Sequence, residues 1–140
     1  MSTLQKIQRG FPGPEENAKP AQPDFSLDVI EAIPFPVAYL DNNNRYVYVN
    51  KAYLDWRDVN KEEVIGKKVD EFLGASVYSL VKDYLQIALN GQPTKYELEI
   101  PFKTGYRHVE VTCTPEFDKS GDLRGYFTFI ADISERKKSE

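Results

Sequence analysis

The stretch Tyr46-Val47-Tyr48-Val49-Asn50-Lys51-Ala52-Tyr53 changes its pattern in the middle. Its first four residues are aromatic or β-branched, which is typical of a strand. From Ala52 onward, the apolar residues predict one or two turns of helix. Asn50 lies at the change, and its short side-chain amide is suited to capping a helix that begins where a strand ends. We therefore predict a strand that runs directly into a helix at Asn50.

A hairpin is predicted just before this junction. The segments Pro36–Leu40 and Arg45–Val49 are both short and rich in β-branched and aromatic residues. The segment Asp41–Asn44 lies between them and contains only Asp and Asn. These residues tolerate the left-handed backbone conformation that a hairpin turn requires.

The N-terminal part of the chain divides into two segments. Residues 1–24 contain several glycines and prolines and no apolar periodicity, so we predict a disordered or linker segment there. From Phe25 to Ile33 the apolar residues fit a short amphipathic helix, with Asp24 or Ser26 as its N-cap. Pro34 and the proline at 36 prevent this helix from continuing.

Helical segments follow the junction. Asn60 is a favourable N-cap, and Glu63 lies where a capping box places its acid. A longer helix is predicted over Ser76–Asn90, because apolar residues recur there at spacings of three and four. Gly91 and Pro93 are the residues expected just after its end.

The last third of the sequence predicts three strands. Thr94–Phe102 and Tyr106–Pro115 alternate apolar with polar residues, as expected for strands with one exposed face. The final strand, Gly125–Ile133, is apolar on both faces, which predicts either a central place in the sheet or a partner on the outer side. The predicted fold is therefore α+β: a five-stranded antiparallel sheet with helices over one face, formed by residues 25–134.

Composition excludes several classes of function. The chain has 140 residues and a net charge of −4, which argues against a surface for nucleic acid or anionic lipid. No apolar run approaches the ~20 residues of a membrane span, and the N-terminus lacks the pattern of a secretory signal. The single cysteine excludes an internal disulfide. We expect a cytoplasmic protein.

Three motifs at the joints of this fold resemble the PAS family of sensory domains. The segment Tyr46–Tyr53 is similar to the family's "yvN.a" junction. The segment Asn60–Lys67 is similar to its "s.eE.iGk" segment, and Asp132–Lys138 to the "DITerk" ending that joins a PAS core to an effector. The three motifs occur in the family's order, and the resemblance covers residues 25–138.

This resemblance implies a cavity between sheet and helices, a homodimer, and output through a helix that continues from the last strand. The exit residues would be Asp132, Ser134, Glu135 and Arg136, with residues 135–140 beginning the exit helix. The spacing of Asp132 and Ser134 suits a local cap that starts a helix. The alternative is a solvated tail after the final strand.

The resemblance also directs attention to cofactors that some PAS domains carry. Haem is usually held by a histidine of the long helix, whereas the only histidine here is His108, on a strand. Flavin adducts use a cysteine in an "NCRFLQ" segment, which is absent. Cys113, the only thiol, alternates with apolar strand residues and is interpreted as a small core residue. Haem held through histidine and a flavin–cysteine adduct are therefore not expected.

Aromatic residues are abundant, with nine tyrosines, eight phenylalanines and one tryptophan. They suit an apolar pocket with a few hydroxyl donors, and they suit plain core packing as well. The candidate pocket residues are Tyr53, Trp56, Tyr84 and Cys113. No catalytic constellation, phosphate loop or set of metal ligands is visible, so we expect no enzyme activity.

The function predicted from the sequence is a sensory PAS domain. It would bind a small ligand or a partner and relay a conformational signal to a C-terminal effector, such as a histidine kinase or a diguanylate cyclase, in a two-component type of system. The alternative is a dimerisation or protein-docking module with a filled core. In that case the two-faced strand Gly125–Ile133 and the helix Phe25–Ile33 would form the interface.

Overall fold

The predicted hairpin forms the first two strands of the sheet. The computed structural model describes residues 27–139, in which β2 (Val37–Asp41) pairs antiparallel with β3 (Tyr46–Val49). The Asp41 carboxylate accepts hydrogen bonds from the backbone N–H groups of Asn43, at 2.9 Å, and of Arg45, at 3.0 Å. Asn44 adopts a left-handed conformation with φ of 65°. The turn is therefore built by the short polar side chains that predicted it.

Three longer strands complete an antiparallel sheet of five. They are β4 (Thr94–Phe102), β5 (Gly105–Phe117) and β6 (Leu123–Asp132), and the strand order is β3-β2-β6-β5-β4. The central place of β6 agrees with its two apolar faces. Gly125 is required where β6 pairs with the end of β2, because a Cβ atom there would lie 2.2 Å from the carbonyl oxygen of Leu40.

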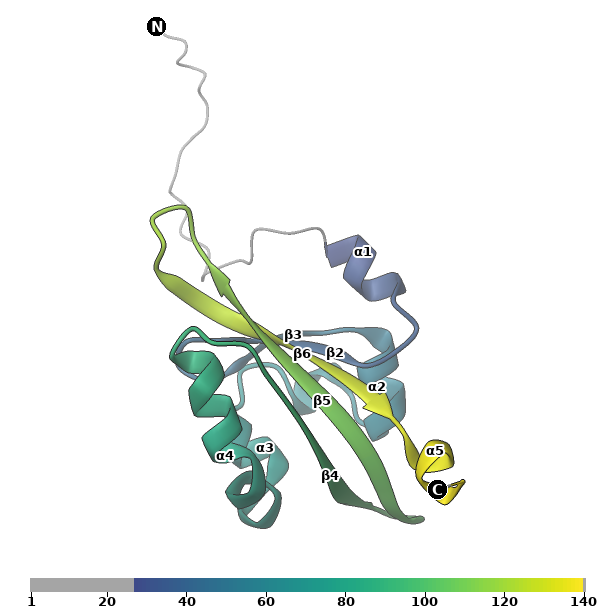
Figure 1. Cartoon of the computed structure of the whole chain (residues 1–140). Helices are drawn as coiled ribbons and strands as arrows, with labels where there is room; N and C mark the ends of the chain where they lie inside the picture. The colour runs from purple at the N-terminus through teal and green to yellow at the C-terminus, as the bar shows by residue number, and fades with distance from the viewer. Residues whose placement is uncertain (1–26, 140) are drawn as a thin grey trace, which may run out of the picture.

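Helices cover one face of this sheet (Figure 1). They are α2 (Lys51–Arg57), the 3₁₀ helix η1 (Lys61–Glu63), α3 (Val69–Leu73) and α4 (Ala75–Leu89). The sequence did not predict α3 as a separate helix, because five residues carry too little periodicity. The flanking helix α1 (Leu27–Ala32) lies on the other side, where the hydroxyl of Tyr48 donates to the Glu31 carboxylate at 2.5 Å.

Asn50 joins the flanking helix, the sheet and α2. Its side-chain oxygen accepts from the N–H groups of Tyr53, at 2.9 Å, and of Val37, at 3.0 Å. Its amide nitrogen donates to the carbonyls of Ile30, at 3.1 Å, and Phe35, at 3.0 Å. The side chain is fully buried. The predicted helix cap is confirmed, and the same amide also anchors α1.

Most element boundaries agree with the sequence to within two residues. The predicted start of the first helix at Phe25, its caps Asp24 and Ser26, and the segment 1–24 lie outside the described residues. Arg45, predicted to belong to a strand, instead forms an isolated bridge with Lys68. Of the long helix, Val81 and Leu85 are buried, whereas Leu80 is 59% exposed, so the buried stripe is narrower than its apolar pattern indicated.

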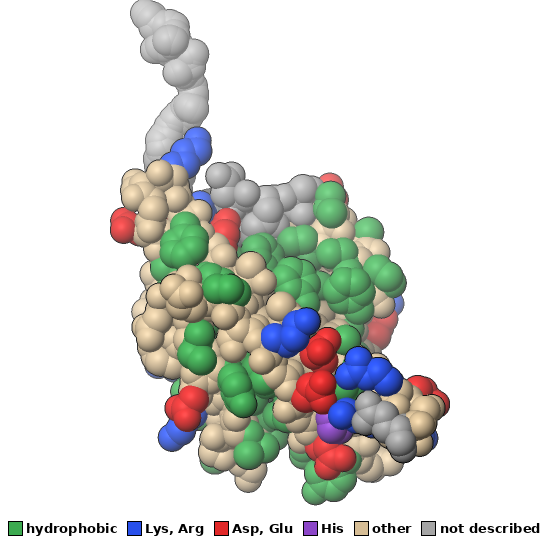
Figure 2. All heavy atoms as spheres, in the orientation of Figure 1, with side chains coloured by type: hydrophobic (Ala, Val, Ile, Leu, Met, Phe, Trp, Pro, Cys, Tyr) green, Lys and Arg blue, Asp and Glu red, His purple; other side chains and the backbone are tan. Residues whose placement is uncertain are grey.

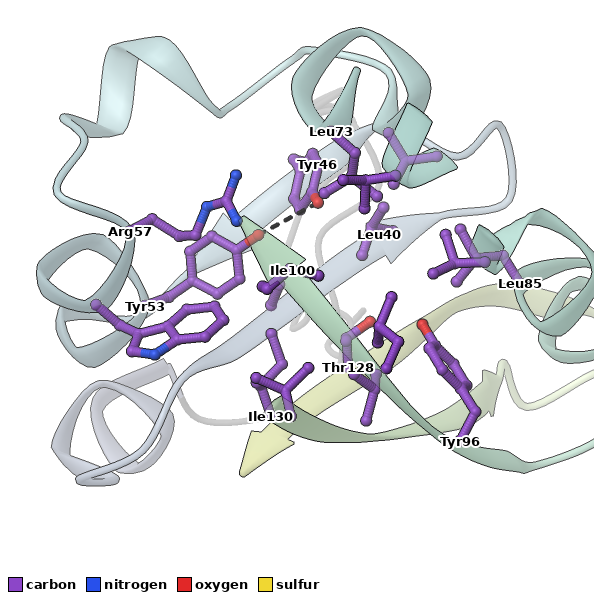
Figure 3. A pocket seen from close by; sticks show the side chains of 18 of the residues that line it. Leu40, Tyr46, Tyr53, Arg57, Leu73, Leu85, Tyr96, Ile100, Thr128 and Ile130 are labelled. Carbon is purple, nitrogen blue, oxygen red and sulfur yellow. Dashed lines mark hydrogen bonds between the residues drawn. The ribbon is translucent and has the colours of Figure 1, made fainter. Parts of the chain in front are cut away.

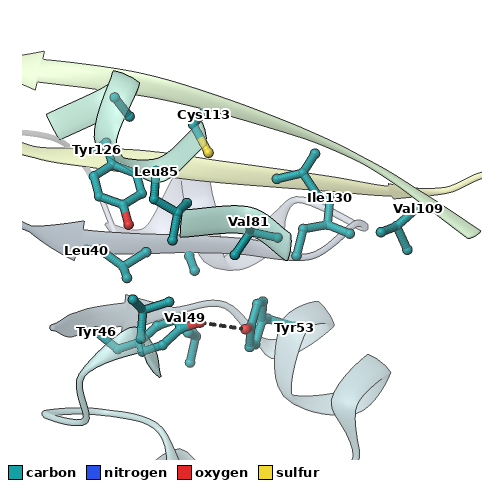
Figure 4. Close-up of a cluster of buried hydrophobic side chains, with 14 of the residues drawn as sticks. Leu40, Tyr46, Val49, Tyr53, Val81, Leu85, Val109, Cys113, Tyr126 and Ile130 are labelled. Atoms are coloured by element: carbon teal, nitrogen blue, oxygen red, sulfur yellow. Dashed lines mark hydrogen bonds between the residues drawn. The ribbon is translucent and has the colours of Figure 1, made fainter. Parts of the chain in front are cut away.

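The core lies between the sheet and the helices (Figure 4). Its side chains come from all five strands and from α2, α3 and α4, and the largest fully buried one is Tyr126. The five-stranded α+β architecture that the sequence predicted is confirmed.

Candidate functional site

A cavity of about 60 Å³ lies within this core, between the inner face of the sheet and the helices. Most of its wall is aliphatic (Figure 3). Its polar atoms belong to a small set of side chains: Tyr46, Tyr53, Trp56, Arg57, Tyr96, Tyr126 and Thr128. An apolar cavity with few polar groups is the usual design of a small-molecule site.

Two of the predicted pocket residues lie in the cavity wall. Tyr53 and Trp56 both belong to α2, and both line the space between the helices and the sheet. The rings contact each other edge to face, with centroids 6.4 Å apart. A role for either residue in ligand binding stays a prediction.

The other two predicted pocket residues do not line the cavity. Tyr84 is 39% exposed on the flank of α4 and stacks on Tyr96 at 4.3 Å between ring centroids. Cys113 is fully buried among the core side chains of the sheet. Its burial raises the pKa of the thiol to about 11, and hydrogen bonds with Thr128 and Tyr96 only partly oppose this rise. Cys113 is therefore protonated and unreactive at neutral pH.

Two tyrosine hydroxyls meet at one side of the cavity. The hydroxyl oxygens of Tyr46 and Tyr53 are 3.3 Å apart, and either group can be the donor. The two residues are only 4% and 3% exposed. Burial raises the pKa of both hydroxyls, so both are neutral at physiological pH.

The end of β6 carries the first predicted exit residue, Asp132. One of its carboxylate oxygens accepts from the N–H and the hydroxyl of Ser134, at 3.0 and 2.6 Å. The other accepts from Arg107, at 2.6 to 2.8 Å, and from the indole N–H of Trp56, at 3.4 Å. Partial burial raises the pKa of Asp132, but the hydrogen bonds from Ser134, Trp56 and Arg107 outweigh it and hold the pKa below its usual value.

A short helix, α5 (Ser134–Lys138), follows directly. The Ser134 hydroxyl also accepts from the backbone N–H of His108, at 3.0 Å. Arg136 and Lys137 reach back to the Glu97 carboxylate of β4, at 3.4 and 3.3 Å. Glu135 pairs instead with Lys138 of its own helix at 3.8 Å.

His108 lies in the middle of this charged group, which we call the exit cluster: Glu97, Arg107, His108, Asp132, Arg136 and Lys137. Figure 2 shows the histidine among acidic and basic side chains at the surface. Its ring nitrogens are 3.4 Å from Glu97 and 3.8 Å from Glu99. The lowered pKa of Glu97 comes first from its hydrogen bond with Lys137 and then also from His108 and Arg136.

Sequence reasoning missed three contributors to these sites. The local pattern places Tyr46 in a strand and does not give its face, which depends on a bulge opposite Tyr39 and Leu40. Arg57 follows Trp56 at the end of α2, where nothing in the local pattern indicates a cavity. Arg107 reaches Asp132 only because β5 pairs with β6.

Two structural findings concern residues 27–139 alone. Across this range, His, Cys, Asp and Glu side chains form no group of three or more that could hold a metal ion. None of the helices described there is long and apolar enough to cross a membrane.

Comparison with known proteins gives one family. The PAS fold family matches residues 30–138. The virulence sensor protein BvgS of Bordetella pertussis is 27% identical over 126 residues, which are 86% of this chain and 10% of BvgS. BvgS of Bordetella parapertussis gives the same values. The chain thus spans about a tenth of the length of these curated relatives.

Solved structures agree with this family. The PAS domain of Bordetella pertussis BvgS is similar with a TM-score of 0.69 and 26% identity, covering 80% of this chain and 86% of that domain. The VqmA–ligand–DNA complex of Vibrio cholerae is similar with a TM-score of 0.65 and 20% identity, covering 95% of this chain and 52% of that one. At 20% identity, the second likeness shows the fold alone.

Proposed function

The chain belongs to the PAS family, and on that premise we propose that it binds a small ligand in its cavity and relays a conformational signal through α5. The family and the likeness to the PAS domain of a sensor protein support a sensory signalling role. The proposed role is non-enzymatic.

One side chain carries the proposal. Trp56 lines the cavity with its ring and donates its indole N–H to Asp132, the residue from which α5 starts. A ligand that displaces the ring would lengthen or break this hydrogen bond, which is already 3.4 Å long. Because Asp132 also holds the first residue of α5, a change at the cavity wall is transmitted to the exit helix by two consecutive hydrogen bonds.

The effector belongs to the same proposal. An exit helix that leaves the last strand can continue into a following domain, and a histidine kinase or a diguanylate cyclase fits the family. Such effectors work in the cytoplasm, and the proposal places this chain there with them. The name of the relative, a virulence sensor protein, supports a sensory context, and we propose a two-component type of system within it.

The relay is testable without knowing the ligand. Val81→Leu adds one methylene group to the cavity wall from α4 and so imitates partial filling. Hydrogen exchange of the amides of residues 134–139 is then measured in four proteins: the parent, Val81→Leu, Trp56→Phe, and the double variant. We expect Val81→Leu to change exchange in α5, and Trp56→Phe, which keeps an aromatic ring but has no N–H, to abolish this change.

The outcomes distinguish a relay through Trp56 from a general destabilisation of the domain. An equal effect of Val81→Leu with and without Trp56→Phe would mean that the signal does not pass through the indole. A uniform rise in exchange over the whole sheet would indicate strain in the core instead. Native mass spectrometry of the protein purified from cells completes the test, because a small molecule bound at one per chain supports the sensing role directly.

A dimerisation module is the second candidate, and one observation favours it. The flanking helix and the turn after it present large apolar side chains to solvent, with Val29 64% exposed and Phe35 45% exposed. Such residues suit a homodimer interface along α1. Sedimentation of the chain over a range of concentrations tests it: Val29→Glu should shift a dimer toward monomer, whereas Lys82→Glu, on the helical side of the sheet, should not.

A further inference from the structure

Arg57 stands at the boundary between the cavity and the surface. Its side chain is part of the cavity wall and also of a surface hollow formed with Asp58, Pro101, Phe102, Lys103 and Thr104. The residue is half-buried at the C-terminal end of α2. Figure 3 shows the Arg57 side chain among those that line the cavity. A small molecule that entered the cavity from the hollow would therefore pass its guanidinium group.

The charge of Arg57 has no anionic partner in the described part of the chain. Its guanidinium carbon lies 5.3 Å from the ring centroid of Phe72, 5.4 Å from that of Phe102 and 6.0 Å from that of Trp56. These are cation–π contacts, which attract the charge but supply no lone pair to its five N–H donors. Within residues 27–139, the Arg57 side chain makes neither a hydrogen bond nor an ion pair, whereas Asp55 and Asp58 of the same segment pair with lysines.

The hydroxyls of Tyr46 and Tyr53 lie beside the Arg57 guanidinium (Figure 3) and supply one further hydrogen-bond donor without an acceptor among the described residues. They bond to each other at 3.3 Å, and within residues 27–139 neither hydroxyl has another hydrogen-bond partner. Whichever hydroxyl accepts, its own hydrogen has no acceptor among the described residues, although both tyrosines are more than nine-tenths buried. The positive charge of Arg57 opposes the rise in pKa that burial causes in both, so the guanidinium acts on the same two oxygens.

We propose that Arg57 and the Tyr46–Tyr53 hydroxyl pair bind the carboxylate of a small aliphatic monocarboxylate, whose hydrocarbon part fills the cavity. This inference rests on the proposed function and names the ligand class of that same site. A carboxylate matches the planar fork of a guanidinium and accepts an additional O–H hydrogen bond. The aliphatic wall, with residues such as Leu40, Ile100 and Ile130, suits a hydrocarbon tail.

The volume of the cavity and the charge of its wall restrict the class of ligand further. A space of about 60 Å³ holds on the order of five heavy atoms, at roughly 10–15 Å³ for each water-sized group. That volume fits a short unbranched chain outside the carboxylate. Arg57 is the one cationic residue in the described cavity wall, so it balances a single negative charge. A phosphate dianion would keep an unpaired charge in a low-dielectric site, which is unfavourable.

The test is a titration of the whole chain with a series of unbranched acids from acetate to octanoate. Binding is measured by isothermal calorimetry or from changes in amide chemical shifts. Each acid is compared with its neutral amide, for example pentanoate with pentanamide. We expect the tightest binding near pentanoate or hexanoate and binding of the amide weaker by about 10- to 100-fold, the loss expected for a hydrogen-bonded charge pair.

Two variants and one control assign the residues. Arg57→Gln should lower the affinity for pentanoate to that of pentanamide while leaving pentanamide unchanged. Tyr53→Phe should weaken the binding of pentanoate by a smaller factor than Arg57→Gln does. Lys82→Gln, which removes one exposed positive charge from α4, should leave both affinities as they are. Thermal unfolding of each variant shows whether it is folded under the titration conditions.

The possible results distinguish this inference from the proposed function. Equal binding of acid and amide, or an Arg57→Gln protein that still prefers the acid, would overturn the role of Arg57 and leave the cavity as a ligand site. Pentanoate could also change amide chemical shifts at the surface hollow alone, with no change at Tyr96 or Ile130. That result would place the site outside the cavity and would also overturn the inference. If neither series binds at millimolar concentration and the protein purifies without a bound molecule, the ligand-sensing function fails together with the inference.

Discussion

The cavity and the exit cluster lie at two places on the same sheet and are held by opposite kinds of interaction. The cavity is surrounded by buried aliphatic and aromatic side chains with few polar atoms. The exit cluster is a set of charged side chains at the surface; Glu97, for example, is 39% exposed and contacts His108, Arg136 and Lys137. Trp56 connects the two, because it lines the cavity and donates to Asp132.

This difference has an energetic consequence. Removing a large side chain from a packed core costs about 2–5 kcal/mol, because the surrounding structure closes only partly over the space that it leaves. An exposed ion pair contributes about 0–1 kcal/mol, because water and salt compete for each partner. In the proposed function, α5 would therefore detach and reattach at a cost that a bound ligand could supply, while the core stays folded. A signalling domain needs this separation of a stable input from a weakly held output.

The largest effect should come from breaking the helix start that positions the cavity wall. Asn50→Ala leaves the N–H groups of Val37 and Tyr53 and the carbonyls of Ile30 and Phe35 without their partner in the interior. We expect the free energy of unfolding to fall by about 3 kcal/mol, measured by urea denaturation. The exposed Asn42→Ala should change it by less than about 0.5 kcal/mol. Similar losses for the two variants would show that the buried amide does not join α1, the sheet and α2.

A smaller and local effect is expected at the exit. Asp132→Ala removes the acceptor for Ser134, Arg107 and Trp56. The free energy of unfolding should fall by about 1 kcal/mol, as for the removal of a helix cap, while hydrogen exchange in α5 becomes fast. Asp83→Ala, an exposed acid on α4, is the control. Global unfolding of the Asp132→Ala protein would make this residue part of the core and would contradict its place in a weakly held output.

Acid should release α5 before it unfolds the core. The pKa values of Asp132 and Glu97 are lowered in the folded protein, so their contribution is complete above their unfolded values of about 4 to 4.5 and is lost as the pH falls through the lowered ones. Amide exchange and chemical shifts of residues 134–139, followed from about pH 7 to pH 3, should change before the circular dichroism of the sheet does.

The double variant Asp132→Asn and Glu97→Gln should remove this pH dependence of α5, because neither amide titrates. Simultaneous loss of α5 and of the sheet in the parent protein would mean that the two regions unfold as one unit.

The smallest expected effect is the absence of a reaction at Cys113. Burial raises the pKa of this thiol to about 11, so a thiol reagent at about pH 8 should modify it only when the whole domain unfolds. A cysteine placed after the exit helix by Ser139→Cys should react at once, because Ser139 is exposed. Rapid modification of Cys113 in the parent would indicate that the core around this residue opens as readily as α5 detaches.

The start of the exit helix could be predicted from the sequence because its features are local. Asp132 and Ser134 are two residues apart, and the bond between them needs only a turn of backbone. The hairpin turn at Asp41–Asn44 and the cap at Asn50 are local in the same way, and both occur in the structure as predicted.

The cavity was predicted only in part, because its wall is assembled from distant segments. Tyr53 and Trp56 lie on a helix that faces the sheet, and both line the cavity. Tyr84 has a similar helical pattern but lies on the flank of α4, and Cys113 lies on the inner face of the sheet but outside the cavity. Periodicity gives the face of an element and does not give the position along a face where packing leaves a space.

The sequence by itself determined the order of the strands and of the longest helix, and the start of α5, because each depends on periodicity, turn chemistry or caps within a few residues. It also indicated the family, through three motifs in the family's order. Only the tertiary structure decided that Trp56 touches both the cavity and Asp132, and that Arg57 lies beside the hydroxyls of Tyr46 and Tyr53 without an anionic partner among residues 27–139. These contacts join residues from different elements, and the pairing of strands and the packing of helices on them set such distances.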